Sequence, residues 1–222
     1  MQTFPTTAPV SAVLDIPAGA IRLIAADRPD TTVEVRPADG SRSRDVQAAE
    51  RIEVACADGV LRIVAPEAKN RVLGHSGAVE ITVQLPAGSR VEAKAAAGEL
   101  RGVGRLGDVV FEGAQATVKL DEAGSARLDL SAGDVCVGRL NGPAEVSTRK
   151  GDITVTEAVS GALTLRTEHG GITVGAARGV SASLDAGTSY GRIHNALRNT
   201  DGAAALTIHA TTAHGDITAR SL

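Results

Sequence analysis

The sequence predicts an all-β protein: a β-solenoid of stacked two-strand coils of about 18–20 residues, capped by an N-terminal hairpin-rich β region. Apolar and polar residues alternate with period two along most of the 222 residues, and 25 glycines punctuate the alternating runs. A unit of similar sequence also recurs in the second half of the chain. We expect an N-terminal β-strand region over residues 1–92 and solenoid repeats over residues 93–222, in one continuous structural unit.

The first ninety residues contain a succession of short alternating segments, which predict strands over 20–24, 32–36, 61–64 and 79–85. Sequences typical of turns lie between them, such as Pro17-Ala18-Gly19 and Ala57-Asp58-Gly59. Residues 45–50 have some helical character but are too few to nucleate a helix without tertiary contacts. We therefore expect a single helical turn there.

From about residue 93 the chain begins to resemble itself. The clearest pair is Gly151-Asp152-Ile153-Thr154-Val155 and Gly170-Gly171-Ile172-Thr173-Val174. Glycines at 98, 133, 151, 170, 191 and 215 mark successive units, with intervals of 35, 18, 19, 21 and 24 residues. The interval of 35 predicts two units with one degenerate marker near residues 115–118. A sharp corner with coils above and below it favours glycine, which tolerates positive φ and leaves space.

Repeats of this length cannot bury an apolar face alone, so stacking is expected to align small aliphatic side chains in rows inside the coil. Such a narrow interior needs no aromatic residue. The alternative is an antiparallel sandwich of hairpins, whose strand spacing would look similar. The expected rows comprise Val135, Ile153, Ile172, Ile193 and Ile217 in one, and Leu128, Leu163, Leu184 and Leu206 in another.

A stacked coil ends in unpaired backbone groups that need covering. We expect the N-terminal strands to cap one end of the solenoid. At the other end, residues 219–222 offer little sequence to shield the last coil. End-to-end self-association is therefore expected.

Composition excludes several classes of partner. The only aromatic residues besides histidine are Phe4, Phe111 and Tyr190, so there are few rings on which bases or sugars could stack. Lys and Arg total 23 against 26 acidic residues, so there is no basic excess for nucleic acid or an anionic membrane. The sequence shows no secretory signal pattern and no apolar run of membrane-spanning length, and we expect a soluble, cytoplasmic protein.

Cysteines and histidines do not form a recognisable metal motif. Cys56 and Cys136 lie singly in apolar strands and are expected to be buried free thiols, bridged only if the fold brings them together. The five histidines, at 75, 169, 194, 209 and 214, include no His-x-x-x-His pair. Residues before the marker glycines should form a column of solvated turn residues, in which Tyr190 separates His169 from His214.

Residues after the marker glycines should form a second column, containing Glu99, Asp134, Asp152 and Asp216. Calcium could relieve the repulsion within it, but the nonapeptide of calcium-binding solenoids is absent. We expect aspartates that accept hydrogen bonds from their own turn backbone.

No arrangement of residues predicts catalysis. The chain lacks a Gly-x-Ser-x-Gly elbow, and its serines have no fixed relation to a histidine and an acid. The match to Gly-x-Gly-x-x-Gly over 102–107 lacks a following helix and reflects the abundance of glycine. We therefore predict no enzyme, and no catalytic, cofactor-binding or metal-binding residue.

The order of these segments resembles a known family. The run 33–37, the segment Val79-Glu80-Ile81-Thr82-Val83-Gln84-Leu85-Pro86-Ala87-Gly88-Ser89, the Gly-Asp-Ile-Thr-Val units and Tyr190-Gly191-Arg192-Ile193-His194-Asn195 are similar to the bacterial putative-adhesin family of β-strand-repeat proteins. This is a domain of unknown function common in actinobacteria. The resemblance covers nearly the whole chain and implies a stacked β architecture. It transfers no catalytic residue.

A chain of repeats in which no catalytic, cofactor-binding or metal-binding motif is recognised favours a structural function. We expect a non-catalytic scaffold that presents sheet faces and coil ends to protein partners or to copies of itself. The alternative is a β-solenoid that binds or cleaves polysaccharide along one face, against which the scarcity of aromatic residues argues.

Overall fold

The computed structural model describes residues 1–66, 77–199 and 203–222. Within them the chain forms one 16-stranded sheet and one helix. The elements are β1 (Gln2–Pro5), β2 (Ser11–Ala26), β3 (Asp30–Pro37), α1 (Ser43–Arg51), β4 (Glu53–Ala57), β5 (Val60–Val64), β6 (Val79–Pro86), β7 (Arg90–Ala132), β8 (Val135–Leu140), β9 (Ala144–Lys150), β10 (Ile153–Ala158), β11 (Gly161–His169), β12 (Ile172–Ala176), β13 (Ala182–Tyr190), β14 (Ile193–Ala196), β15 (Leu206–His214) and β16 (Ile217–Ser221).

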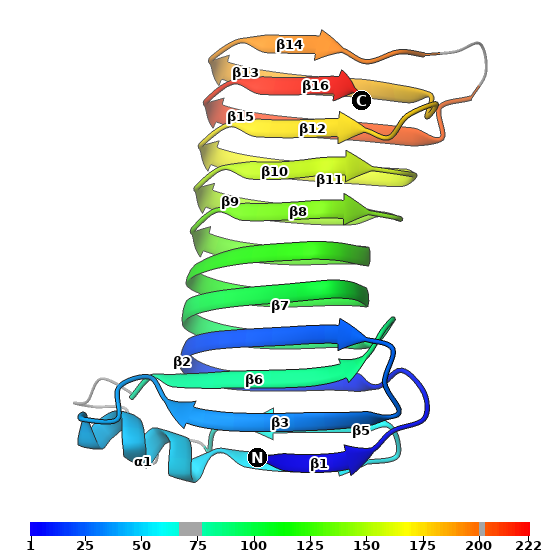
Figure 1. Ribbon diagram of the computed structural model, residues 1–222. Coiled ribbons are helices and arrows are strands. Elements are labelled where there is room, and N and C mark those ends of the chain that lie inside the picture. The colour runs from blue at the N-terminus through cyan, green and yellow to red at the C-terminus, as the bar shows by residue number, and fades with distance from the viewer. Residues whose placement is uncertain (67–76, 200–202) are drawn as a thin grey trace.

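The chain winds into a β-solenoid whose coils stack in parallel register, as Figure 1 shows. The long strand β7 bends through several corners without interruption and supplies successive layers in the middle of the stack. After it, each layer consists of one strand on either side, such as β9 with β10 and β11 with β12. The solenoid prediction is therefore confirmed. The division at residue 92 stays a prediction, and β2 pairs with β7 across it.

The C-terminal strands lie one layer inside the stack, whereas the N-terminal strand β1 lies at the edge of the sheet. The C-terminal strand β16 lies between β12 and β14, and β15 lies between β11 and β13 (Figure 1). At the other end β2 lies between β6 and β7. The outermost layer of the solenoid is therefore formed by β13 and β14. Our expectation that residues 219–222 lie at the open end is wrong, because the last coil in sequence is inserted before the preceding one.

The first predicted row of aliphatic side chains is confirmed as a set. The register aligns Val135 with Ile153, Ile153 with Ile172, Ile172 with Ile217, and Ile217 with Ile193. All of these residues are buried except Ile193, which is 46% exposed because it lies in the outermost layer.

The second predicted row is confirmed for Leu163 and Leu184, which both align with Ile208, and is wrong for Leu128 and Leu206. Leu163 stacks on Ala144 and Ile208, whereas Leu128 stacks on Val146, one inward position further along the strand. Both positions face the core, and a shift by two residues leaves the inward face unchanged. Alternation alone therefore could not choose between the two registers.

The N-terminal end is capped by antiparallel strands and the helix. Strands β1 and β3 extend the sheet beyond β6, and β4 extends it beyond β5. The helix has nine residues and is longer than the single turn expected. Its half-buried Ala48, Ala49 and Ile52 pack against the core. The buried Asp45 carboxylate accepts a hydrogen bond from the Ala78 backbone amide at 2.9 Å, which fixes the helix beside β6. This tertiary support stabilises a helix too short to form alone.

Candidate functional site

A column of glycines forms one corner of the solenoid. Gly19 begins the column with φ of +136°, and five later glycines have φ between +132° and +157°. At Gly151 an added Cβ would lie 2.1 Å from the carbonyl oxygen of Gly133 in the layer below. At the predicted degenerate marker Ala116 takes the place of glycine, since its carbonyl oxygen underlies Gly133. The five glycines are Gly98, Gly133, Gly151, Gly170 and Gly215.

The aspartates that follow these glycines bind the next layer. Asp134 Oδ1 accepts a hydrogen bond from the Asp152 amide at 2.9 Å, and Asp152 Oδ1 accepts one from the Gly171 amide at 2.7 Å. Asp216 Oδ1 accepts one from the Arg192 amide at 2.8 Å. The expectation that each aspartate bonds its own turn is therefore wrong. The carboxylates are linked through intervening amides, and no cluster of potential metal ligands occurs among the residues described.

The residues before the glycines form a column of side chains that ends in three stacked rings. His214 stacks on His169 with ring centroids 4.8 Å apart, and Tyr190 stacks on His214 at 4.9 Å. Lys150 occupies the layer before His169. We expected Tyr190 to separate the histidines, which is wrong because β15 lies between β11 and β13. Tyr190 is 71% exposed and lies in the outermost layer. Of the remaining histidines, His75 lies outside the described residues.

A ladder of buried threonines beside this corner was not foreseen. The Thr167 hydroxyl donates a hydrogen bond to the Gly151 carbonyl oxygen at 3.0 Å, and the Thr212 hydroxyl donates one to the Gly170 carbonyl oxygen at 3.0 Å. Thr188 in the outermost layer repeats the contact on Gly215 at 3.1 Å. The signal in the sequence is a threonine three positions before each marker glycine in these units. It was missed because threonine is also common on exposed strand faces.

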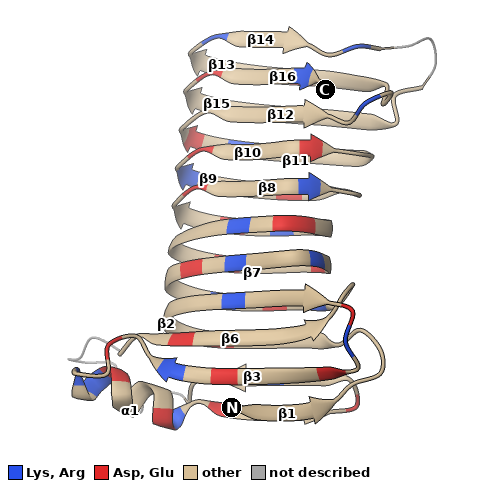
Figure 2. Cartoon of the chain, viewed as in Figure 1, with Lys and Arg blue, Asp and Glu red and all other residues tan. Residues whose placement is uncertain are grey.

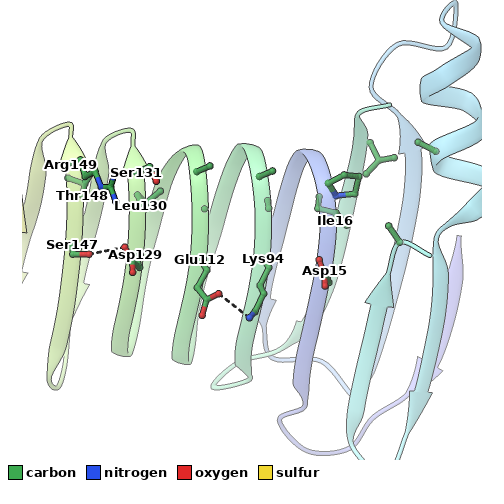
Figure 3. Close-up of a pocket in the computed structure, with 18 of the residues that line it drawn as sticks. Asp15, Ile16, Lys94, Glu112, Asp129, Leu130, Ser131, Ser147, Thr148 and Arg149 are labelled. Carbon is green, nitrogen blue, oxygen red and sulfur yellow. Dashed lines mark hydrogen bonds and ion pairs between the residues drawn. The ribbon is translucent and has the colours of Figure 1, made fainter. Parts of the chain in front are cut away.

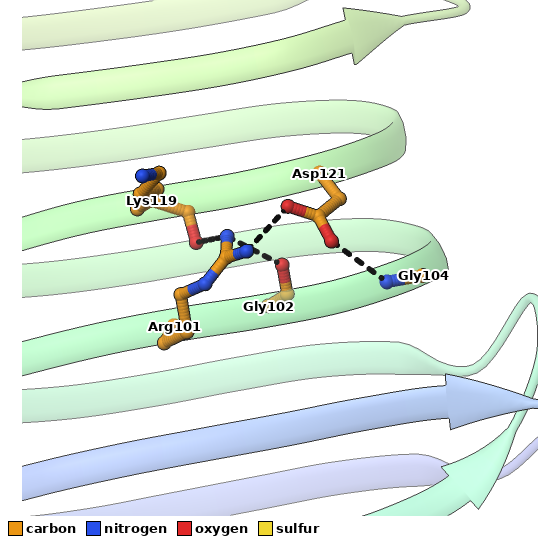
Figure 4. A network of polar contacts seen from close by, with 5 residues as sticks. All are labelled: Arg101, Gly102, Gly104, Lys119 and Asp121. Atoms are coloured by element: carbon orange, nitrogen blue, oxygen red, sulfur yellow. Dashed lines mark hydrogen bonds and ion pairs between the residues drawn. The ribbon is translucent and has the colours of Figure 1, made fainter.

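The outward faces carry pairs of opposite charge that connect neighbouring layers. Arg101 donates to Asp121 at 2.6 Å, and Asp121 also accepts from the Gly104 amide at 3.3 Å (Figure 4). Arg127 and Glu145 form another pair at 2.8 Å. Charges of both signs are spread along the stack, as Figure 2 shows. In this view blue and red segments alternate along the described layers.

An open groove of about 1610 Å³ runs along one sheet face beside α1. The Lys94 ammonium group lies 3.0 Å from the Glu112 carboxylate, which raises the pKa of Lys94 above its ordinary value of 10.5 (Figure 3). Ser147 donates to Asp129 at 2.9 Å in the same row of outward residues. Two pairs of the labelled side chains, Lys94 with Glu112 and Ser147 with Asp129, thus bind one another across neighbouring layers.

Both cysteines are free. Cys56 lies on β4 in the N-terminal cap and Cys136 lies on β8, and each is half-buried, less than expected. The single helix of the described chain is too short and too polar to span a membrane. No buried polar side-chain atom lacks a hydrogen-bond partner in the described part of the chain.

Within the described residues, the parallel pairing of layers stops at the outermost layer, formed by β13 and β14. Strand β14 pairs only with β16, and β13 pairs only with β15, so within the described chain one edge of each strand has no neighbour. Ile193 and the half-buried Leu184 and Ala186 are inward-facing residues with no layer above them. We call the exposed edges of β13 and β14 and the side chains between them the open end.

The sequence profile of the family described as Toastrack DUF4097 matches residues 104–220. The chain belongs to the Toastrack family. The match spans the repeating layers from within β7 to β16, including the corner glycines from Gly133 onward. It agrees with the resemblance to β-strand-repeat proteins inferred from the sequence. No curated protein matches this Toastrack chain in sequence.

Several solved structures are similar to this Toastrack protein in fold. A "putative adhesin" from Bacteroides fragilis is 12% identical, with a TM-score of 0.38, and the alignment covers 98% of this chain and 95% of that chain. A "putative lipid binding protein" from Parabacteroides distasonis is also 12% identical, with a TM-score of 0.48 and the same coverage. A "putative cell adhesion protein" from Clostridium sporogenes is 10% identical, with a TM-score of 0.36 and coverage of 100% and 98%.

Proposed function

We propose that this Toastrack protein is a non-catalytic interaction scaffold whose binding surface is the open end. The observation that carries the proposal is the outermost layer, in which two strand edges and the residues between them have no further layer on their outer side within the described chain. Unpaired strand edges recruit further strands, because the main-chain hydrogen bonds supply affinity. The expected partner is therefore a protein with an exposed strand or coil edge.

The remaining described surfaces support the same proposal, because several of their polar groups are already bound to other groups of the protein. Along the described faces several charged side chains are paired between layers, as Lys94 is with Glu112 and Arg101 is with Asp121. The corner aspartates are held by backbone amides, and the histidine rings of the stack lie against other rings. Each of these groups stabilises contact between layers and is not free to act on a substrate.

Site-specific photocross-linking tests this function. A photoreactive residue at Ile193 lies in the open end, and the same residue at Thr173 lies on the exposed outer face of β12. In cells that produce the protein, the probe at position 193 should give one discrete protein adduct, and the probe at position 173 should not. Equal labelling from both positions, or none from position 193, would contradict the proposal. The cytoplasmic location expected from the sequence belongs to the same proposal, and cell fractionation tests it.

A further inference from the structure

We propose that the partner at the open end is a second copy of this chain, and that two copies join end to end about a two-fold axis perpendicular to the solenoid axis. This inference rests on the proposed function and specifies its partner. The same axis reverses strand direction, so the edges of β13 and β14 meet strands of the second copy in antiparallel register.

The shape of the open end favours another coil. It presents two strand edges with inward-facing Leu184, Ala186 and Ile193 between them. A single added strand covers one edge and leaves the other edge and the interior in water. A coil of the same cross-section covers both edges and the interior at once. The open end of a second copy has that cross-section.

The two ends of the solenoid differ, and the difference selects the symmetry. The N-terminal end is covered by β1, β3 and β4, with α1 packed beside them (Figure 1). At that end β3 pairs with β6 in antiparallel orientation, so β3 runs opposite to the parallel-stacked coils. The surface complementary to the open end is therefore the open end itself. A contact between identical surfaces closes as a dimer, whereas a head-to-tail contact would grow into a filament.

Charge at the open end permits this contact. Residues 182–196 contain one acidic side chain, Asp185, and one Lys or Arg side chain, Arg192. With His194 neutral the layer has no net charge, so two facing copies bring no excess of one sign together. Ile193, 46% exposed, and Tyr190, 71% exposed, supply the apolar area that dimerisation would remove from water.

The sequence provides a probe in the right place. Tyr190 is the only tyrosine, and the chain has no tryptophan, so intrinsic fluorescence reports the open end alone. Sedimentation velocity on the purified full chain should show a monomer–dimer equilibrium that ends at two copies. Over the same concentration range, acrylamide quenching of Tyr190 should decrease as the ring becomes covered.

Two matched variants locate the contact. Ile193→Lys places two charges in the centre of the dimer interface and should raise the dissociation constant at least about 100-fold. Thr173→Lys adds the same charge on an exposed outer position and should leave the constant unchanged. Both variants should keep the β-type circular dichroism of the parent protein, which shows that each is folded.

The outcomes separate this inference from the proposed function. A monomer at every concentration, a filament, or a dimer that Ile193→Lys does not weaken would overturn the inference. If the purified chain is monomeric while the probe at position 193 still gives an adduct with a different protein, the dimer is wrong and the interaction scaffold stands. If the chain is monomeric and no adduct forms, both are wrong.

Discussion

Replacing Thr167 by valine tests whether the buried threonine ladder stabilises the stack. The substitution keeps the branched shape and removes the hydroxyl that donates to Gly151 at 3.0 Å, at a position only 5% exposed. A hydrogen bond contributes about 0.5–1.5 kcal/mol, and a buried carbonyl left without its donor costs about 1–3 kcal/mol. We expect the free energy of unfolding to fall by about 1–3 kcal/mol. In a protein of this size the Tm should fall by about 2–12 °C.

Thermal and urea unfolding followed by circular dichroism measure this change, and Thr173→Val is the matched control. Thr173 lies in the same coil but is exposed on the outer face of β12, so the same substitution there should change stability by less than about 0.5 kcal/mol. Equal effects of the two variants would refute the reasoning, because they would show that the buried hydroxyl contributes no more than an exposed one.

Three further predictions concern a corner glycine, an ion pair in the N-terminal cap and the stacked rings of His214 and Tyr190. Gly151→Ala should lower the free energy of unfolding, measured in urea, by more than about 3 kcal/mol, because φ is +146° and the added Cβ meets the Gly133 carbonyl oxygen. Gly187→Ala is the control and should be tolerated, because no atom lies within 4 Å of the added Cβ. Arg28 donates to Asp30 at 2.9 Å and holds the pKa of that carboxyl below its ordinary 3.8, so its stabilisation is present above about pH 3.8 and lost as pH falls through the lowered value. Arg28→Gln should therefore raise the Asp30 pKa in an NMR titration, and an unchanged pKa would contradict the assignment. His214→Leu removes the ring against Tyr190 and should change the tyrosine emission, whereas His194→Leu, outside the stack, should not.

The solenoid could be predicted from the sequence because its signals are local and repeated. Glycine spacing identified the corners, including the degenerate one at Ala116, and alternation identified the inward row through Ile153 and Ile172. The layer order was not predictable. Residues 206–221 and 182–196 both have the pattern of a coil, so either could follow β11 and β12. Choosing between them depends on packing between layers, which a sequence pattern does not encode.

The candidate site was predicted only in part, and for a related reason. The sequence placed His169, Tyr190 and His214 in one column but gave their order incorrectly, so it missed the direct contact of the two histidines. It expected an open end but assigned it to residues 219–222 instead of β13 and β14. Both errors follow from the single assumption that layers stack in the order of synthesis.

The order of the layers in the solenoid differs from the order in which their strands are synthesised. Strands β13 and β14 leave the ribosome before β15 and β16, yet they attach to the solenoid only through them. Residues 206–221 therefore join the coil of residues 182–196 to the rest of the sheet. A premature stop near residue 205 would remove one coil from the polypeptide and detach a second.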